Sequence, residues 1–258
     1  EKGLLTTRDF YNDLVAIYFY VLRTFRCFGA RDVISWHWGI QSKPAIFFTM
    51  EEDKRDQFRL RSFRLRGDRM TKAQAEALLN HWNKFEIPLQ GTINPREVFL
   101  SFRPKEVIVE IGSGMGEATA QIAAENPDCG YIAVEVHKAG IGALVLRAET
   151  LGIRNLKIIE GDIWEVLNHH IDDGAVDAFH IFFPDPWPKR KQQKRRMLQP
   201  HFIEILAKKL RSGGRINIAT DWIPYAQEIE KNFASNTNFY GGPIKRPDWR
   251  PLTKFESK

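Results

Sequence analysis

The chain has 258 residues, 43% of them hydrophobic and 27% charged, which is the size and composition of a soluble globular protein with one large domain or two small ones. The net charge of +6 is modest but clustered, which favours a nucleic acid or another polyanion as partner over a merely solvated basic face. Two cysteines, Cys27 and Cys129, provide neither a disulfide framework nor a metal set, so we expect no metal and a reducing, cytoplasmic setting.

The first 49 residues are rich in aromatic side chains. Their most apolar piece, residues 14–22, is too short for a membrane span, which needs about 20 residues. The cationic start and the small-residue cleavage site of a secretory signal are both missing. We therefore expect a short amphipathic helix and no membrane association, with Met50 as a candidate natural start.

Residues 50–100 form a basic entry segment. Cations alternate there with phenylalanine and leucine, a mixture that favours RNA binding, through phosphate contacts and base stacking, over a mobile basic arm. The cations of this segment are Arg59, Arg61, Arg64, Arg66 and Arg69.

Thr71 is a candidate helix cap, and the helix formers after it predict a helix to about residue 82.

Residues 101–258 show strands that alternate with helices. This alternation predicts an α/β domain with a parallel, doubly wound sheet, and we divide the chain accordingly into 1–49, 50–100 and 101–258. The expected strands are 107–111, 131–136, 156–159, 176–183 and 215–219, and the expected helices are 117–125, 138–151, 163–168, 197–210 and 223–234.

A glycine loop follows the first of these strands, in the order EIGSGMG. Gly112 and Gly114 allow a ligand to approach the backbone, and Glu135 ends the next strand, where an acid meets ribose hydroxyls. A dinucleotide is disfavoured because the spacing is not G-x-G-x-x-G and Glu110 would repel its phosphates. S-adenosylmethionine carries cationic groups and no phosphate, and Asp162 is placed to meet its adenine amine.

The stretch IFFPDPWPKRKQQKRR, residues 181–196, combines two kinds of site. A buried strand delivers Asp185 and Trp187 to its carboxyl end, where ligands bind in open α/β sheets. Trp187 is equally compatible with stacking on a base and with packing at the strand end. We expect the cations from Lys189 to Arg196 to hold phosphates, and the specific candidates are Arg190, Lys191, Lys194 and Arg195.

Several motifs resemble the bacterial tRNA (guanine-N7-)-methyltransferases. They are EIGSGMG, VEVHKAGI, FPDPWPKRKQQKRRMLQPHF, ATDW and RPLTKFE, and the similarity extends over about residues 61–256. The resemblance implies a Rossmann-like class I S-adenosylmethionine-dependent fold. That family has a further strand after TKFE, whereas this chain stops at Lys258, which leaves the last strand of the sheet in question.

The resemblance also implies roles for individual residues. The family's cofactor acids fall on Glu110, Glu135, Asp162 and Asp185. Its substrate contacts fall on Lys189, Asp221, Thr253, Lys254, Phe255 and Glu256.

The implied reaction is methylation of guanine N7 at position 46 of the tRNA variable loop. N7 has a lone pair and no proton, so no strong base is needed, and His137 and His180 are expected to be structural. The catalytic candidate is Asp185, whose carboxylate favours the cationic product or holds the methionine part of the cofactor.

Two other functions stay open. One is an amino-group methyltransferase acting on adenine or cytosine, although the split prolines Pro184 and Pro186 do not present adjacent carbonyls to an exocyclic amine. The other is a non-catalytic RNA-binding protein with the same fold. We expect no obligate protein partner and a monomer or homodimer.

Overall fold

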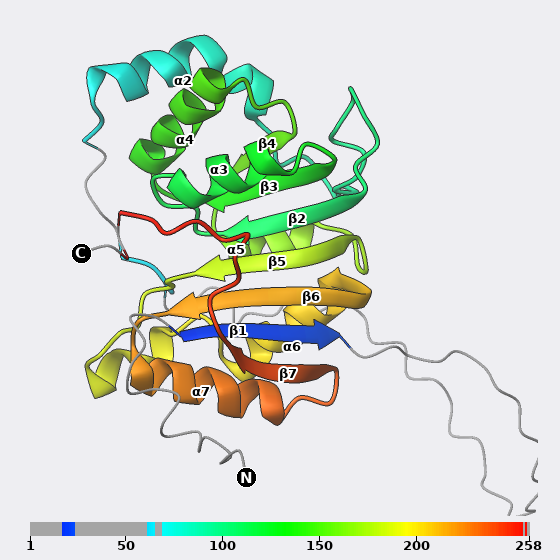
Figure 1. Cartoon of the computed structure of the whole chain (residues 1–258), viewed down its shortest axis with the longest axis vertical. Helices are drawn as coiled ribbons and strands as arrows, with labels where there is room; N and C mark the ends of the chain where they lie inside the picture. The colour runs from blue at the N-terminus through cyan, green and yellow to red at the C-terminus, as the bar shows by residue number, and fades with distance from the viewer. Residues whose placement is uncertain (1–16, 24–60, 65–68, 255, 257–258) are drawn as a thin grey trace, which may run out of the picture.

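The computed structural model describes residues 17–23, 61–64, 69–254 and 256. They form a seven-stranded sheet in the order β4-β3-β2-β5-β6-β1-β7, with helices on both faces (Figure 1). The strands are β1 (Ile17–Arg23), β2 (Glu106–Ile111), β3 (Cys129–Glu135), β4 (Leu156–Glu160), β5 (Val176–Phe182), β6 (Leu210–Thr220) and β7 (Phe239–Ile244). The helices are α2 (Lys72–Phe85), α3 (Glu117–Glu125), α4 (Lys138–Leu151), α5 (Ile163–Glu165), η2 (Val166–His170), η3 (Arg190–Arg195), α6 (Pro200–Lys209) and α7 (Ile223–Ala234).

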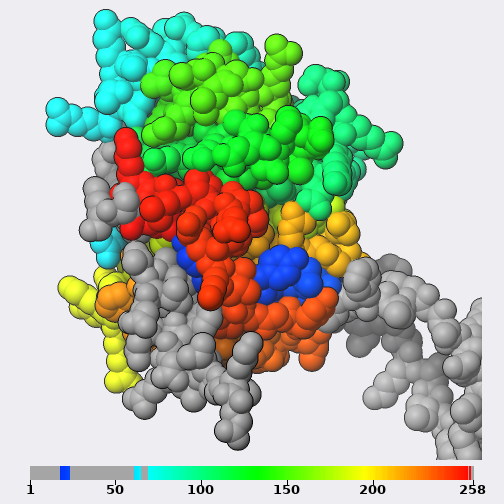
Figure 2. Space-filling view, in the orientation of Figure 1, coloured from blue at the N-terminus to red at the C-terminus, as the bar shows by residue number. Residues whose placement is uncertain are grey.

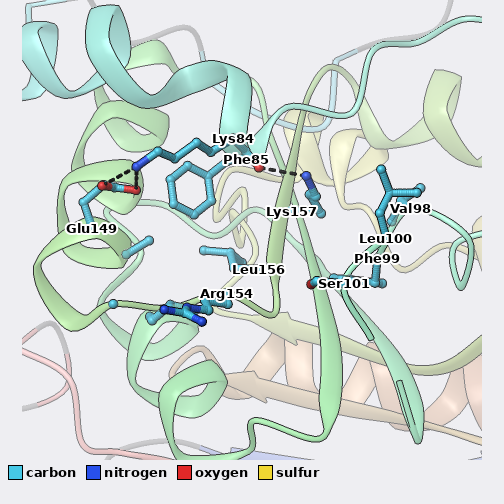
Figure 3. Close-up of a pocket in the computed structure, with 13 residues that line it drawn as sticks. Lys84, Phe85, Val98, Phe99, Leu100, Ser101, Glu149, Arg154, Leu156 and Lys157 are labelled. Atoms are coloured by element: carbon cyan, nitrogen blue, oxygen red, sulfur yellow. Dashed lines mark hydrogen bonds and ion pairs between the residues drawn. The ribbon is translucent and has the colours of Figure 1, made fainter. Parts of the chain in front are cut away.

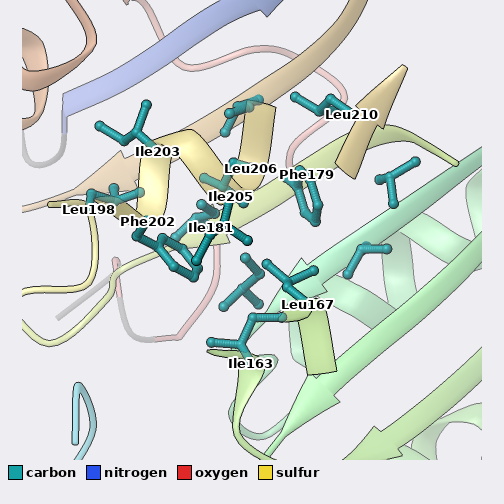
Figure 4. Close-up of a cluster of buried hydrophobic side chains, with 14 of the residues drawn as sticks. Ile163, Leu167, Phe179, Ile181, Leu198, Phe202, Ile203, Ile205, Leu206 and Leu210 are labelled. Carbon is teal, nitrogen blue, oxygen red and sulfur yellow. The ribbon is translucent and has the colours of Figure 1, made fainter. Parts of the chain in front are cut away.

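The five adjacent strands β4, β3, β2, β5 and β6 are parallel, as the alternation of strands and helices predicts. Strands β2, β3 and β5 are buried on both faces, which explains why their sequences are largely apolar. One face packs on α5, η2, α6 and α7, and the core there includes Phe179, Ile181 and Phe202 (Figure 4). The other face packs on α2, α3 and α4 through Tyr131, Leu144 and their neighbours.

The N-terminal strand β1 corrects two expectations. Residues 17–22 of the expected amphipathic helix form a strand, and residues 14–16 lie outside the described part of the chain. Tyrosine, phenylalanine and valine in IYFYVLR favour a pleated strand, in which Phe19 and Val21 reach the core of one face and Tyr18 reaches the other.

The second correction concerns the last strand of the sheet. β1 pairs antiparallel with both β6 and β7, so it fills the position between them, and β7 itself was not expected. The backbone groups of β6 and β7 that face each other across this position are paired with β1, which removes two strand edges.

Of the residues named in the sequence analysis, Met50, Arg59 and Arg66 lie outside the described residues.

The remaining boundaries agree with the predicted ones to within a few residues, apart from β6, which starts at Leu210, five residues before the expected 215. The expected helix 163–168 is a short α-helix followed by the π-helical turn η2. Among the described residues, no helix is both long and apolar enough to cross a membrane.

The segment after β7 runs back across the sheet. Figure 1 shows it crossing from β7 over β1, β6 and β5 towards α3, and Figure 2 shows its atoms between those of α3 and β1. Trp249 of this segment stacks on His180 of β5, with ring centroids 5.1 Å apart. The segment therefore covers sheet surface that none of the described helices covers on that side.

Candidate active site

A pocket of about 200 Å³ lies at the carboxyl ends of β2, β3, β4 and β5. Ligands bind at this edge in open α/β sheets because the loops there diverge. Five of the predicted cofactor residues line it together: Gly112, Gly114, Glu135, Asp162 and Asp185.

The glycine loop is shaped for a ligand. Gly112, Gly114 and Gly116 have φ angles of 74°, 56° and 70°, a left-handed conformation that side chains disfavour. A Cβ added at Gly112 or Gly114 would meet no protein atom within 4 Å, so the space beside the loop is open. The loop therefore offers bare backbone to the pocket.

Glu135 holds this loop as well as facing the pocket. One carboxylate oxygen accepts the backbone N–H of Gly114 at 2.7 Å. The other accepts the N–H groups of Val136 at 2.8 Å and His137 at 3.0 Å. Sequence reasoning assigned Glu135 to ribose hydroxyls and missed these backbone bonds, because they depend on how β2 and β3 lie side by side.

Replacing Glu135 with alanine is expected to weaken S-adenosylmethionine binding by roughly 1–3 kcal/mol, because three partly buried N–H groups lose their acceptor and the loop is released. Isothermal titration calorimetry measures this, with Glu149→Ala as the control. Glu149 lies on α4 and pairs with Lys84 on the outer surface. Unchanged affinity in the Glu135 variant would contradict the assignment.

Glu110 and Asp162 occupy different depths. Glu110 is only 3% exposed, and its Oε2 atom has no hydrogen-bond partner among the described residues. Burial raises its pKa to about 7. Asp162 caps α5 by accepting the N–H of Trp164 at 3.0 Å and lines the pocket. Glu110 thus lies beneath the pocket wall and Asp162 lies in it.

The loop that carries Asp185 is tightly constrained. Phe183 and Trp187, on either side of it, have positive φ angles of 54° and 42°, which is strained for residues with side chains. The Asp185 carboxylate accepts the backbone N–H of Arg64 at 3.1 Å. Strain of this kind persists only where surrounding contacts impose it, so Asp185 is firmly placed at the pocket.

The entry segment closes this side of the pocket, which sequence reasoning did not predict. Ser62, Phe63 and Arg64 line the pocket. The indole N–H of Trp187 donates to the Ser62 carbonyl at 3.0 Å, and the guanidinium groups of Arg64 and Arg195 lie 5.1 and 4.9 Å from the Trp187 ring. Trp187 is 3% exposed, so of its two interpretations the packing role fits the structure.

The cationic run divides into an exposed part and a buried part. Lys189, Arg190, Lys191 and Lys194 are exposed on or beside η3. Arg196 is 3% exposed, pairs with Glu228 and donates to the Pro186 carbonyl at 2.9 Å. The expectation that Arg196 holds phosphate is wrong because its charge is already used inside the protein.

The implied substrate contacts that the structure describes lie in different environments. Asp221 is exposed after β6. Lys254 is exposed, and its backbone N–H donates to Glu117 at 3.2 Å. Thr253 and Glu256 are buried against each other, and Phe255 lies outside the described residues.

A second hollow, of about 450 Å³, lies near the amino end of β4 (Figure 3). Lys84 pairs there with Glu149, and the Lys157 ammonium donates to the Lys84 carbonyl at 2.7 Å. Its lining contains no predicted site residue, although it is larger than the first pocket. Volume alone therefore does not identify the site.

The fold and the first pocket define a class I methyltransferase, with a glycine loop and strand-end carboxylates around a small-molecule site. A family model described as "Putative methyltransferase" matches residues 104–258. A tRNA (guanine-N(7)-)-methyltransferase of Streptomyces avermitilis is 40% identical over 206 residues, 78% of this chain and 70% of that protein. One of Neisseria meningitidis is 43% identical over 203 residues, 77% of this chain and 84% of that protein. The chain belongs to the tRNA (guanine-N7-)-methyltransferase family, which confirms the resemblance seen in its motifs.

Solved structures show a more distant similarity. The precorrin-6y C5,15-methyltransferase of Geobacter metallireducens is 19% identical with a TM-score of 0.41, over 54% of this chain and 68% of that chain.

Proposed function

We propose that this S-adenosylmethionine-dependent enzyme methylates N7 of the guanine at position 46 in the variable loop of tRNA. The observation that carries the proposal is a juxtaposition. A pocket with a bare glycine loop and three carboxylates opens beside a short helix of exposed cations. Membership of the family supports the same substrate.

The pocket fits S-adenosylmethionine. Open space beside Gly112 and Gly114 leaves room for the methionine part, and the unpartnered Oε2 of Glu110 lies beneath the same loop. Glu135, Asp162 and Asp185 add acceptors for hydroxyl, amine and ammonium groups. When bound, the cofactor supplies an electrophilic methyl group on a sulfonium.

The protein's contribution is positioning and electrostatics. Guanine N7 attacks through its own lone pair and loses no proton, so no residue has to act as a base. Asp185, held by the Arg64 N–H and by a loop that the Trp187 indole fixes to Ser62, presents negative charge where the base becomes cationic. Most of the rate then comes from alignment of the two reacting groups.

The exposed cations are proposed to hold the tRNA backbone. Replacing Arg190, Lys191 and Lys194 with alanine should weaken tRNA binding and reduce the salt dependence by up to roughly 2–3 units of log–log slope, since each phosphate contact releases counterions. Filter binding at several salt concentrations measures the slope, and cofactor affinity should not change.

The control removes three cations elsewhere: Lys105 before β2, and Lys208 and Lys231 in the last turns of α6 and α7. An equal loss of slope in the control would indicate a general charge effect. No loss in the first variant would mean that η3 does not face the tRNA.

The proposed function is tested by product analysis. Unmodified tRNA transcripts with guanine or adenine at position 46 are incubated with labelled S-adenosylmethionine, and the nucleosides are separated by mass spectrometry. We expect 7-methylguanosine from the first transcript and no product from the second. Methylated adenine or cytosine would establish the amino-group alternative, and cofactor binding without any product would favour a binding protein.

We also propose that the enzyme acts in the cytoplasm, where its tRNA substrate is found, as a monomer or homodimer without an obligate partner. Light scattering on the purified chain, with and without tRNA, measures its mass. A mass above that of a homodimer would contradict this.

A further inference from the structure

A buried polar cluster joins β1 to the TKFE motif beside the active site. The Glu256 carboxylate accepts hydrogen bonds from the Thr253 N–H at 3.1 Å and from its hydroxyl at 2.9 Å. Arg250 Nη1 lies 2.7 and 2.8 Å from the two carboxylate oxygens, and the Tyr18 hydroxyl donates to one of them. A carboxylate has about four lone-pair sites, so that of Glu256 is saturated by the protein itself.

This saturation changes the role expected for Glu256. A buried carboxylate with all its sites in use is not available to a guanine edge. What it does is close the turn from Thr253 to Glu256 and hold that turn in one shape. The exposed Lys254 and the neighbouring Thr253 are then the groups that the turn presents.

Arg250 connects the turn to the strand that carries the catalytic loop. Its guanidinium is 1% exposed and lies 4.5 Å from the ring centroid of Phe182, 5.2 Å from that of Phe183 and 5.3 Å from that of Tyr18. Phe182 ends β5, and Phe183 lines the cofactor pocket two positions before Asp185. One buried cation thus contacts the turn, the pocket wall and β1.

The turn also contacts the helix that follows the glycine loop. Lys254 donates its backbone N–H to Glu117, which lies in the first turn of α3, directly after the glycine loop. The turn is therefore linked to Phe183 in the pocket wall through Arg250 and to the start of α3 through Lys254.

From these contacts we propose that β1 contributes a positioning residue to the active site. Tyr18 of β1, Arg250 and Glu256 form one unit that holds the Thr253–Lys254 turn against the guanine. The inference rests on the proposed function, because the turn is assigned to the substrate there. β1 lies outside residues 104–258, which the family model matches. Tyr18 therefore comes from a segment that the family model does not include.

A double-mutant cycle tests whether Tyr18 acts through Glu256. Tyr18→Phe removes only the hydroxyl and keeps the ring in β1, and Glu256→Gln weakens its acceptor. Each single variant should lower kcat/KM for tRNA by about 5- to 20-fold, with the cofactor Kd within about twofold. The double variant should be no worse than Glu256→Gln alone, since groups that act through one contact are not additive.

Tyr20→Phe is the matched control, because Tyr20 lies two residues along β1 on the same face. It should keep wild-type kinetics. If Tyr18 only helped β1 to pack, its effect would persist in full in the Glu256→Gln background. That additivity, or wild-type kinetics in Tyr18→Phe, would overturn the inference.

The same cycle is measured by thermal unfolding without tRNA. Non-additive shifts in Tm support the link between Tyr18 and Glu256 independently of catalysis, and additive shifts overturn it. If the wild-type protein binds S-adenosylmethionine but does not methylate tRNA, the proposed function is wrong. The unfolding cycle would then still show whether Tyr18 acts through Glu256.

Discussion

Asp185→Asn is expected to lower kcat/KM for tRNA methylation by about 10²-fold, near 3 kcal/mol, the usual cost of one preorganised electrostatic contact. The substitution keeps the shape of the side chain and removes its charge. The loop should stay in place, because the buried Trp187 indole and its hydrogen bond to the Ser62 carbonyl hold it independently of that charge. tRNA affinity should stay within about threefold, since phosphate contacts elsewhere dominate it.

Single-turnover methyl transfer to an unmodified transcript measures the loss of methylation efficiency, and filter binding measures the tRNA affinity. Asp172→Asn is the control, because Asp172 is exposed just after η2, away from the pocket. Wild-type turnover in the Asp185 variant would contradict the electrostatic role proposed for Asp185. A large loss of tRNA binding would make Asp185 a structural residue of the loop.

Gly140→Ala should reduce S-adenosylmethionine affinity at least tenfold, although alanine favours a helix over glycine by about 1 kcal/mol. The added Cβ would lie 2.3 Å from the carbonyl oxygen of Gly114, a backbone atom that cannot swing aside. Either the start of α4 or the glycine loop must move, and displacement of the loop spoils the surface that receives the cofactor. Calorimetric titration of the cofactor measures the loss.

Gly142→Ala is the matched control on the same helix. Its Cβ would lie 3.0 Å from the backbone oxygen of Gln74 in α2, so it strains the packing of α4 on α2 instead. Its Tm should fall while cofactor affinity stays within about twofold. Equal losses of affinity in both variants would show that α4 packing in general, and not contact with the loop, is responsible.

The central sheet was predictable because each element carries its own signal. The β-branched run of β2, the glycines after it and the helix formers of α3 are local features, and their alternation leaves a parallel sheet as the natural arrangement. In a parallel sheet, residues at the carboxyl ends of the strands meet at one edge. For that reason Gly112, Glu135 and Asp185 could be predicted to line one site without any coordinates.

The role of individual charges could not be predicted in the same way. Arg195 and Arg196 are adjacent cations in one run, yet one lies over the Trp187 ring and the other pairs with Glu228 in α7. Whether a charge faces solvent depends on what folds back against it. The closure of the pocket by residues 62–64 depends in the same way on Trp187 and on the Asp185 carboxylate.

By itself, the amino-acid sequence determined the fold class, the sheet edge at which the pocket lies and the family, because these depend on periodicity, glycine spacing and residues close together in the chain. Only the tertiary structure decided where residues 17–23 belong. Their aromatic and β-branched residues suit a strand, but β6 and β7 provide the partner edges, and both lie about 200 residues further along the chain. The same long-range closure places Tyr18 on Glu256, a contact that no local pattern encodes because hydrogen bonding between distant segments follows from their packing.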